Sequence, residues 1–157
     1  MKQLVLAAKD GVRVRLILPK YSDWPQYVLA SQYLYSYFLK NKVDIYQWKN
    51  SILHGKLATF DGKFSTIGSF NLNYTSYQEN LEMNVDVVSE LFTHELNLKI
   101  EDWIANGCEK IDGQSFMRNS TFKERFLRHL FYLMLSLTAK LTINMAFIEA
   151  RSRRMPS

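Results

Sequence analysis

The residues best suited to chemistry lie close together in one segment, 52-ILHGKLATFDGKFSTIGSFN-71. It contains His54 and Lys56, separated by one residue, and further along Ser69 and Asn71. A lysine brings a compact positive charge, and a hydroxyl and an amide bring hydrogen bonds for phosphoryl oxygens. A histidine acts as a nucleophile or as an acid and base near neutral pH. Together these groups predict a site for a phosphate ester.

The dipeptide Asp61-Gly62 lies between the two halves of this segment and is a strong signal for a tight β-hairpin. If these two residues form the whole loop, His54 lies opposite Ser69 in the ladder. Because side chains at alternate positions share a face, the histidine, the lysine, the serine and Asn71 are then expected on one side of the sheet. A bulge or a longer loop would shift this register. Asp61 itself is expected at the turn, away from the phosphate.

A carboxylate for the histidine is expected from the segment 81-LEMNVDVV-88, whose alternation of apolar and polar residues predicts a strand. Its apolar face would hold Leu81, Met83, Val85 and Val87, and its polar face Glu82, Asn84 and Asp86. A carboxylate at Glu82 would fix the tautomer of the His54 imidazole and raise its basicity. Taken alone, His54 and Lys56 would be ordinary surface or core residues, so the prediction depends on the full set.

The elements around this segment predict an α/β fold. Residues 12–19 and 43–48 read as strands, and a helix over 26–41 lies between them, preceded by caps at Ser22 or Asp23. Strand, helix and strand in this order indicate a βαβ crossover with a parallel pair. A further helix is expected over 90–107, capped by Ser89 and closed by Gly107.

The length of 157 residues suits a chain of ordinary domain size with a real core. We expect a catalytic domain over 1–112, with 112–121 as a linker, and a helical tail over 113–157. Cys108 is the only cysteine, so neither an internal disulfide nor a cysteine metal cluster is available. The N-terminal segment is a poor signal peptide because charged residues interrupt its short apolar run.

The positive charge of the chain is concentrated in the tail. Residues 115–157 hold eight Lys and Arg against two Glu, a net +6, which leaves −1 for residues 1–114 out of the total of +5. A basic amphipathic helix over 122–150 fits an anionic membrane surface, whereas nucleic acid is an unlikely partner for the main body. Packing of the tail on the body is the competing interpretation, followed by a membrane-spanning helix.

The pattern His-x-Lys-x4-Asp, followed by Gly-Ser-x-Asn, resembles the signature of the phospholipase D superfamily. Its members here are His54, Lys56, Asp61, Gly68, Ser69 and Asn71. The surrounding residues, from about 4 to 107, are similar to the C-terminal half of bacterial cardiolipin synthases of that superfamily. The resemblance implies an α/β fold with a mixed sheet flanked by helices.

The resemblance also implies a two-step, metal-independent transfer without a cofactor. One histidine attacks phosphorus to give a phosphohistidine, the other protonates the leaving alcohol, and an acceptor alcohol or water then releases the phosphoryl group. By this likeness His54 is the nucleophile or the acid and base, Glu82 supports it, and Lys56, Ser69 and Asn71 bind phosphate. Asp61 matches the motif and is expected to have an orienting or structural role.

The mechanism needs two histidines in two motifs, and this chain carries one motif. His94 and His129 lie outside any second motif and are expected to be structural or solvent-facing. Either the chain is the C-terminal half of a longer enzyme, or two copies each supply one motif across a twofold axis. The position of Met1 inside an apparent helix before the first strand favours the fragment.

Three functions remain open at this point. The first is a phosphatidyltransferase acting on phosphatidylglycerol-like lipids at the cytoplasmic side of the bacterial inner membrane. The second is a hydrolase of the same superfamily, either a phospholipase or a dimeric single-motif nuclease. The third is an inactive fragment that binds lipid surfaces. The basic amphipathic tail favours lipid over nucleic acid as the partner.

Overall fold

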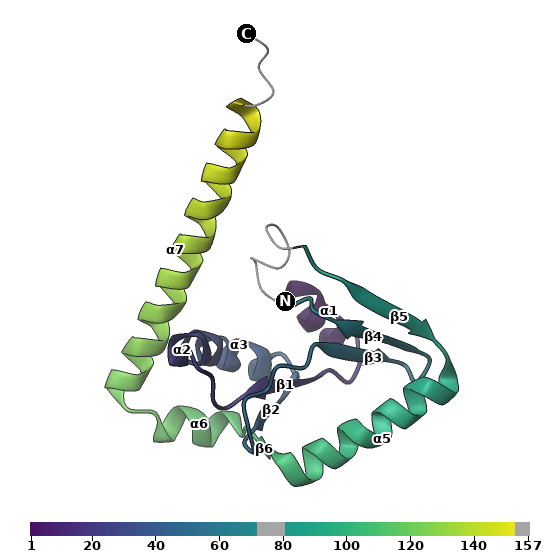
Figure 1. Cartoon of the computed structure of the whole chain (residues 1–157). Helices are drawn as coiled ribbons and strands as arrows, with labels where there is room; N and C mark the ends of the chain where they lie inside the picture. Colours follow the sequence, from purple (N-terminus) through teal and green to yellow (C-terminus); the bar gives the residue numbers. More distant parts are fainter. Residues whose placement is uncertain (72–80, 153–157) are drawn as a thin grey trace.

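A computed structural model describes residues 1–71 and 81–152, with side chains as far as Thr142 in the last helix. Its elements are α1 (Lys2–Lys9), β1 (Arg15–Pro19), α2 (Pro25–Tyr33), α3 (Tyr35–Lys40), β2 (Asp44–Trp48), β3 (Leu57–Phe60), β4 (Phe64–Gly68), β5 (Asn84–Val88), α5 (Glu90–Gly107), β6 (Cys108–Lys110), α6 (Gly113–Asn119) and α7 (Phe122–Ser152). The predicted α/β class, with a helical C-terminal tail, is confirmed. The strands form two three-stranded sheets, β1-β2-β6 and β3-β4-β5 (Figure 1).

The first sheet contains the predicted βαβ unit. Strands β1 and β2 pair in parallel, from Arg15 opposite Asp44 to Pro19 opposite Trp48, and β6 adds an antiparallel edge. The single helix predicted between them is divided at Leu34 into α2 and α3. The cause is local, because the Leu34 amide bonds the Ser31 carbonyl three residues back, which tightens the turn.

The core lies between the first sheet and its helices. It consists of Val5, Ala8, Tyr35, Phe38, Val43, Ile45 and Ile111. Tyr35 is fully buried and its hydroxyl accepts a hydrogen bond from the Gln47 amide at 3.1 Å. Burial raises the pKa of Tyr35, so this phenol stays neutral and the polar pair is compatible with the apolar core.

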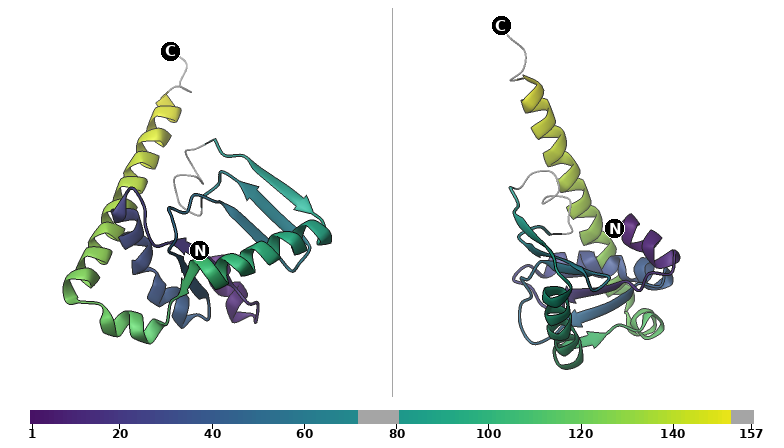
Figure 2. Two further views of the ribbon diagram at one scale, coloured as in Figure 1. Left: turned by 60° about the horizontal axis from the view of Figure 1, so that its bottom comes forward. Right: turned by 90° about the vertical axis from the view of Figure 1, so that its right-hand side faces the viewer.

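Helix α5 joins the two sheets. It lies against one face of β3-β4-β5 and runs into β6 of the first sheet (Figures 1 and 2). The Ser65 and Thr93 hydroxyls, both 0% exposed, lie 2.8 Å apart, and Thr59 donates to Asn97 at 2.8 Å. On the first sheet, Arg15 makes two hydrogen bonds to Glu101, and these bonds lower the pKa of that carboxyl.

Both ends of α5 were predicted from the sequence. Ser89 is the N-cap, and its hydroxyl accepts a hydrogen bond from the Phe92 amide at 3.3 Å, as expected. Gly107 is the last residue of the helix, as expected. The glycine is needed there for close packing and not for a left-handed C-terminal cap. A Cβ at this glycine would lie 2.1 Å from the Trp48 ring, so packing against β2 demands the small residue.

The prediction of a linker over 112–121 is wrong, because α6 occupies most of it. Asp112 caps this helix by accepting a hydrogen bond from the Ser115 amide at 2.7 Å. Phe116 then packs on Tyr35, with ring centroids 5.4 Å apart. The Asp-Gly and Ser residues that suggested a loop therefore form a helix start. The division into domains at 1–112 and 113–157 stays a prediction.

The tail is helical, as predicted, and α7 begins by packing on α2. Tyr132 stacks on Tyr33 with centroids 4.5 Å apart. Arg128 donates to the Gln32 side chain at 3.0 Å and to the Ser120 hydroxyl at 2.6 Å, and burial lowers its pKa. The first turns of α7 are thus attached to the body. Within the described residues, no helix is long and apolar enough to cross a membrane.

Replacement of Thr93 by valine tests whether the buried hydroxyl pair holds the second sheet on α5. The change leaves the Ser65 hydroxyl buried without this partner. We expect the free energy of unfolding to fall by about 1–3 kcal/mol, the usual cost of an unpaired buried polar group. Chemical denaturation followed by circular dichroism measures the change.

The matched control is the same substitution at Thr142, an exposed residue of α7, which should change stability by less than about 0.5 kcal/mol. The double variant Ser65→Ala, Thr93→Val removes both hydroxyls. It should be less destabilised than the sum of the two single variants. Strict additivity would contradict the proposed coupling of these two residues.

Candidate active site at the open end of the hairpin

The hairpin has the predicted turn but not the predicted register. Asp61 and Gly62 both have positive φ, 50° and 69°, and the Lys63 amide bonds the Phe60 carbonyl at 3.0 Å. Pairing then resumes between Phe60 and Phe64, so Lys63 belongs to the loop. The expected pairing of His54 with Ser69 is therefore wrong by one residue.

Lys63, the third residue of the loop, contacts the residues at the start of α5. Its carbonyl accepts a hydrogen bond from the Ser89 amide at 3.0 Å, and its ammonium lies 3.3 Å from the Glu90 carboxylate. This pair continues the antiparallel register of β4 and β5, in which Phe64 lies opposite Val88. Lys63 is therefore outside the β3-β4 ladder but still paired with the residue that follows β5.

The motif residues come together at the open end of the hairpin, in the segments that flank the strands. His54 and Lys56 precede β3, whereas Ser69 and Asn71 follow β4. The Gly68 amide donates to the Lys56 carbonyl at 3.0 Å, which holds the two segments side by side. The sequence predicted that these side chains share one face of the sheet, and the observed register does not support that arrangement. The segments that carry them instead lie at one end of the sheet.

The motif side chains have few contacts of their own. Lys56 donates from its ammonium to the carbonyl of His54 at 2.8 Å, and this bond fixes the bend between them. His54 is exposed. In residues 1–71 and 81–142, no hydrogen bond links the imidazole to Ser69 or Asn71. Asp61 lies in the turn, at the other end of the strands.

Strand β5 brings Glu82 to the same end of the sheet. The Ser69 amide donates to the Met83 carbonyl at 3.0 Å, and the Met83 amide donates to the Ser69 hydroxyl at 3.0 Å. These bonds continue the β4-β5 ladder past Gly68, so the residue before Met83 lies next to the motif. Glu82 is half-buried. The support of His54 by the Glu82 carboxylate stays a prediction.

Sequence reasoning missed the positioning role of Asn84. Its amide donates to the Thr66 hydroxyl at 3.2 Å and its oxygen accepts from the Phe70 amide at 3.2 Å. A single side chain thereby clamps the strand that leads to Ser69. The alternation of residues 81–88 had placed Asn84 on the same face as Glu82, and that was the signal that could have found it.

Gly68 allows this clamp. A Cβ at Gly68 would lie 2.1 Å from the Asn84 side-chain oxygen and 2.3 Å from the Met83 carbonyl. No real Cβ approaches that closely, so any larger residue forces β5 away from β4. The glycine of the Gly-Ser-x-Asn sequence is therefore required by close packing of two strands at the site.

The surface beside Glu82 is apolar and open to solvent. Leu81 is 105% exposed, Met83 76% and Val85 59%. The sequence predicts that these residues share an apolar face with Val87, and α5 covers that face only toward the Ser65 end of the sheet. An apolar sheet surface of this kind is typical of an interface.

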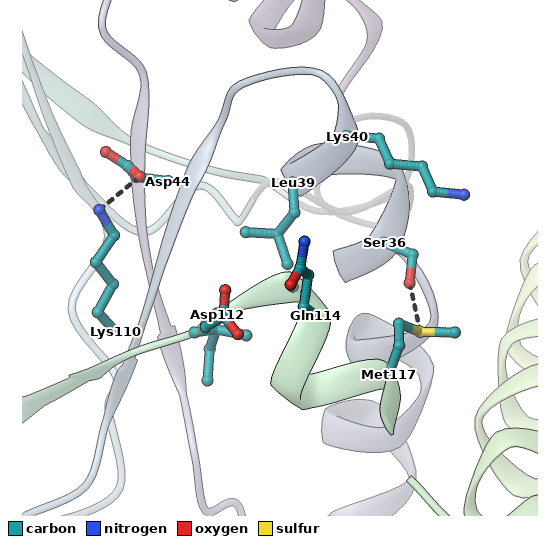
Figure 3. Close-up of a pocket in the computed structure, with 10 residues that line it drawn as sticks. Ser36, Leu39, Lys40, Asp44, Lys110, Asp112, Gln114 and Met117 are labelled. Carbon is teal, nitrogen blue, oxygen red and sulfur yellow. Dashed lines mark hydrogen bonds and ion pairs between the residues drawn. The ribbon is translucent and has the colours of Figure 1, made fainter. Parts of the chain in front are cut away.

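One hollow of the described surface lies away from the motif residues. A groove of about 750 Å³ is formed by α3, α6 and the ends of β2 and β6 (Figure 3). Lys110 and Asp44 form an ion pair of 2.9 Å on one side, and the Ser36 hydroxyl donates to Met117 on the other. None of the motif residues lines this groove. In the part of the chain that the structure describes, no cluster of three potential metal ligands is found.

Alanine at Gly68 tests the clamp. The new methyl group clashes with Asn84 and Met83, so we expect stability to fall by about 1–3 kcal/mol. Amide hydrogen exchange at Ser69 and Phe70, measured by NMR, should accelerate because β5 moves away. Gly55→Ala is the control, since a Cβ there meets nothing within 4 Å. Equal effects of the two substitutions would contradict the packing argument.

The comparisons with known proteins agree on one family. A family model described as cardiolipin synthase, PLD-like domain, matches residues 1–104. Cardiolipin synthase B of Salmonella typhi is 32% identical over 130 residues, which cover 78% of this chain and 32% of that protein. The protein of the same name from Escherichia coli K12 gives the same values. Cardiolipin synthase A of Buchnera aphidicola is 31% identical over 128 residues, covering 82% of this chain and 26% of that protein.

The chain thus spans about a third or less of the length of these relatives. The family match extends from α1 almost to the end of α5, and includes both the hairpin and β5. The motif of His54, Lys56 and Asp61 lies within it. With this match, the chain belongs to the phospholipase D-like family of the cardiolipin synthases.

Proposed function

We propose that this chain supplies one half-site of a phosphatidyltransferase of cardiolipin synthase type, which acts on the phosphodiesters of phospholipids. The observation that supports the proposal is that the segments carrying His54 and Lys56 and those carrying Ser69 and Asn71 flank the strands at the same end of one sheet, where Glu82 precedes β5. A phosphodiester there would meet positive charge, hydrogen-bond donors and an imidazole together.

The reaction has two displacements at phosphorus. In the first, an imidazole nitrogen forms a bond to phosphorus while the bond to the leaving alcohol oxygen breaks, and a second histidine protonates that oxygen. In the second, this histidine removes the proton of an acceptor alcohol, which attacks phosphorus and frees the first imidazole. His54 takes either of these two roles. Glu82 orients it and stabilises its charged form.

The three polar residues bind the phosphoryl oxygens in this proposal. One ammonium hydrogen of Lys56 is used by the His54 carbonyl at 2.8 Å, which leaves two for phosphate. The Ser69 hydroxyl accepts from the Met83 amide, and its oxygen lies 3.5 Å from the Met83 carbonyl oxygen, a long hydrogen bond, so the hydroxyl hydrogen can turn to a phosphoryl oxygen. Asn71 adds amide donors. Asp61 has an orienting or structural role in the turn.

The second motif must come from outside these residues or from a second copy of the chain. The exposed apolar surface of Leu81, Met83 and Val85 beside Glu82 supports such a covering unit. It would exclude water from the phosphohistidine and favour an alcohol acceptor over hydrolysis. With phosphatidylglycerol-like substrates, we place the chain at the cytoplasmic side of a bacterial inner membrane, in contact with it through residues 122–150.

The test follows labelled phosphatidylglycerol in mixed micelles with the 157-residue chain, whose mass in solution is measured in parallel. If two copies assemble a site, cardiolipin and glycerol form in proportion to the dimer, and phosphatidic acid stays a minor product. We expect His54→Ala to lower the rate at least about a hundredfold, because it removes the nucleophile or the acid and base.

His94→Ala is the control, since His94 is an exposed residue of α5 outside the motif. Its activity should match that of the wild type. A dimeric wild type that turns over no lipid, or a His54→Ala variant with full activity, contradicts the proposal. Phosphatidic acid as the main product would make the enzyme a hydrolase.

A further inference from the structure

Helix α7 has two different sides along its described length. One side faces the body, where Tyr132 stacks on Tyr33 and Arg128 bonds Gln32. Beyond α2 the helix continues away from both sheets (Figures 1 and 2). The other side, turned away from α2, therefore has no covering element in the described structure. Its composition shows what could cover it.

A stripe of large apolar side chains follows the uncovered side. Its members are Phe122, Phe126, Leu130, Leu133, Leu137 and Leu141, with exposed fractions from 37% to 86%. Their spacings of four, four, three, four and four residues keep them on one line of an α-helix. We call this set the apolar stripe. It faces solvent over about 30 Å, at 1.5 Å per residue.

The charges beside the apolar stripe have one sign. Lys123, Arg125 and Lys140 are exposed on this part of α7. Glu124 is the only acidic residue between 122 and 142, and its carboxylate accepts hydrogen bonds from the amide and hydroxyl of Thr121. It is thus engaged in capping the helix. The surface offered to a partner is apolar in the middle and cationic at its margins.

This pattern disfavours a second copy of α7 as the partner. Two such helices packed stripe to stripe would bring lysine and arginine margins together, whereas coiled coils pair opposite charges at their flanking positions. An anionic lipid surface fits both the apolar stripe and its cationic margins. The acyl chains would bury the apolar side chains, and the lipid phosphates would pair with the lysines and arginines. A helix lying flat in the interface also fits the absence of a spanning helix in the described residues.

We propose that the apolar stripe of α7 is the docking face for an anionic lipid surface, with the helix parallel to the bilayer and its α2 side carrying the body. The proposal names the residues through which the proposed enzyme would meet its substrate layer, and so deepens the proposed function. Its evidence is nevertheless independent of the chemistry of His54.

The experiment is flotation of the 157-residue chain with vesicles of phosphatidylcholine, with and without phosphatidylglycerol. We expect binding to the anionic vesicles and a loss of binding at high salt, because exposed charges are screened. Leu133→Glu and Leu137→Glu should each weaken binding at least about tenfold. Each removes a leucine that membrane binding would bury, and each adds a negative charge that anionic lipids repel. Both leucines are exposed, so the fold should persist, and circular dichroism checks this.

Thr142→Glu is the matched control, because it adds the same charge to an exposed position on the opposite side of the helix. It should bind almost as the wild type does. Equal binding of Leu137→Glu and Thr142→Glu would overturn the proposal, as would equal binding to both vesicle types. A dimer that Leu137→Glu dissociates would show instead that a second copy covers the stripe.

The outcome is separable from that for the proposed function. His54→Ala should float with the vesicles as the wild type does, since the motif lies outside α7. A chain that binds vesicles through the stripe but transfers no phosphatidyl group would refute the function and keep the docking face. A chain that transfers phosphatidyl groups normally in micelles but does not bind vesicles would refute the docking face and keep the proposed function.

Discussion

The hydroxyl pair of Ser65 and Thr93 is the contact on which the arrangement of this chain depends. Both groups are fully buried at 2.8 Å, so each satisfies the other where water cannot. The pair holds the second sheet against α5, and the bonds from Arg15 to Glu101 hold the first sheet against the same helix. Two small sheets thereby take up a defined relation through one helix.

The candidate site depends indirectly on this arrangement of the two sheets around α5. The N-cap residue of α5 pairs with Lys63 and extends the β4-β5 ladder, while Asn84 clamps the strand that leads to Ser69. Gly68 permits the clamp because a side chain there would meet Asn84. Backbone hydrogen bonds thus hold the segments of the motif together, while the His54 and Ser69 side chains are exposed.

Local signals predicted much of the fold. The caps at Ser89 and the alternating strands depend on neighbouring residues, and both were found where expected. Errors arose where distant contacts override local preference. The segment 112–121 reads as a loop, but Asp112 caps a helix that Phe116 holds against Tyr35. The alternation of Leu81, Met83 and Val85 indicates an apolar strand face but does not say what covers it, and all three are exposed.

The sequence by itself determined which chemical groups the candidate site contains. His54, Lys56, Ser69 and Asn71 flank one tight turn, so a hairpin brings their segments close together. The sequence also determined that α7 would be an amphipathic, basic helix. Only the tertiary structure decided the register of the hairpin, and it brings the segments of the motif to one sheet end without placing them on the predicted sheet face. The loop holds Lys63 as a third residue, so the pairing of the strands shifts by one position, and a shift of one position moves side chains to the other face of the sheet.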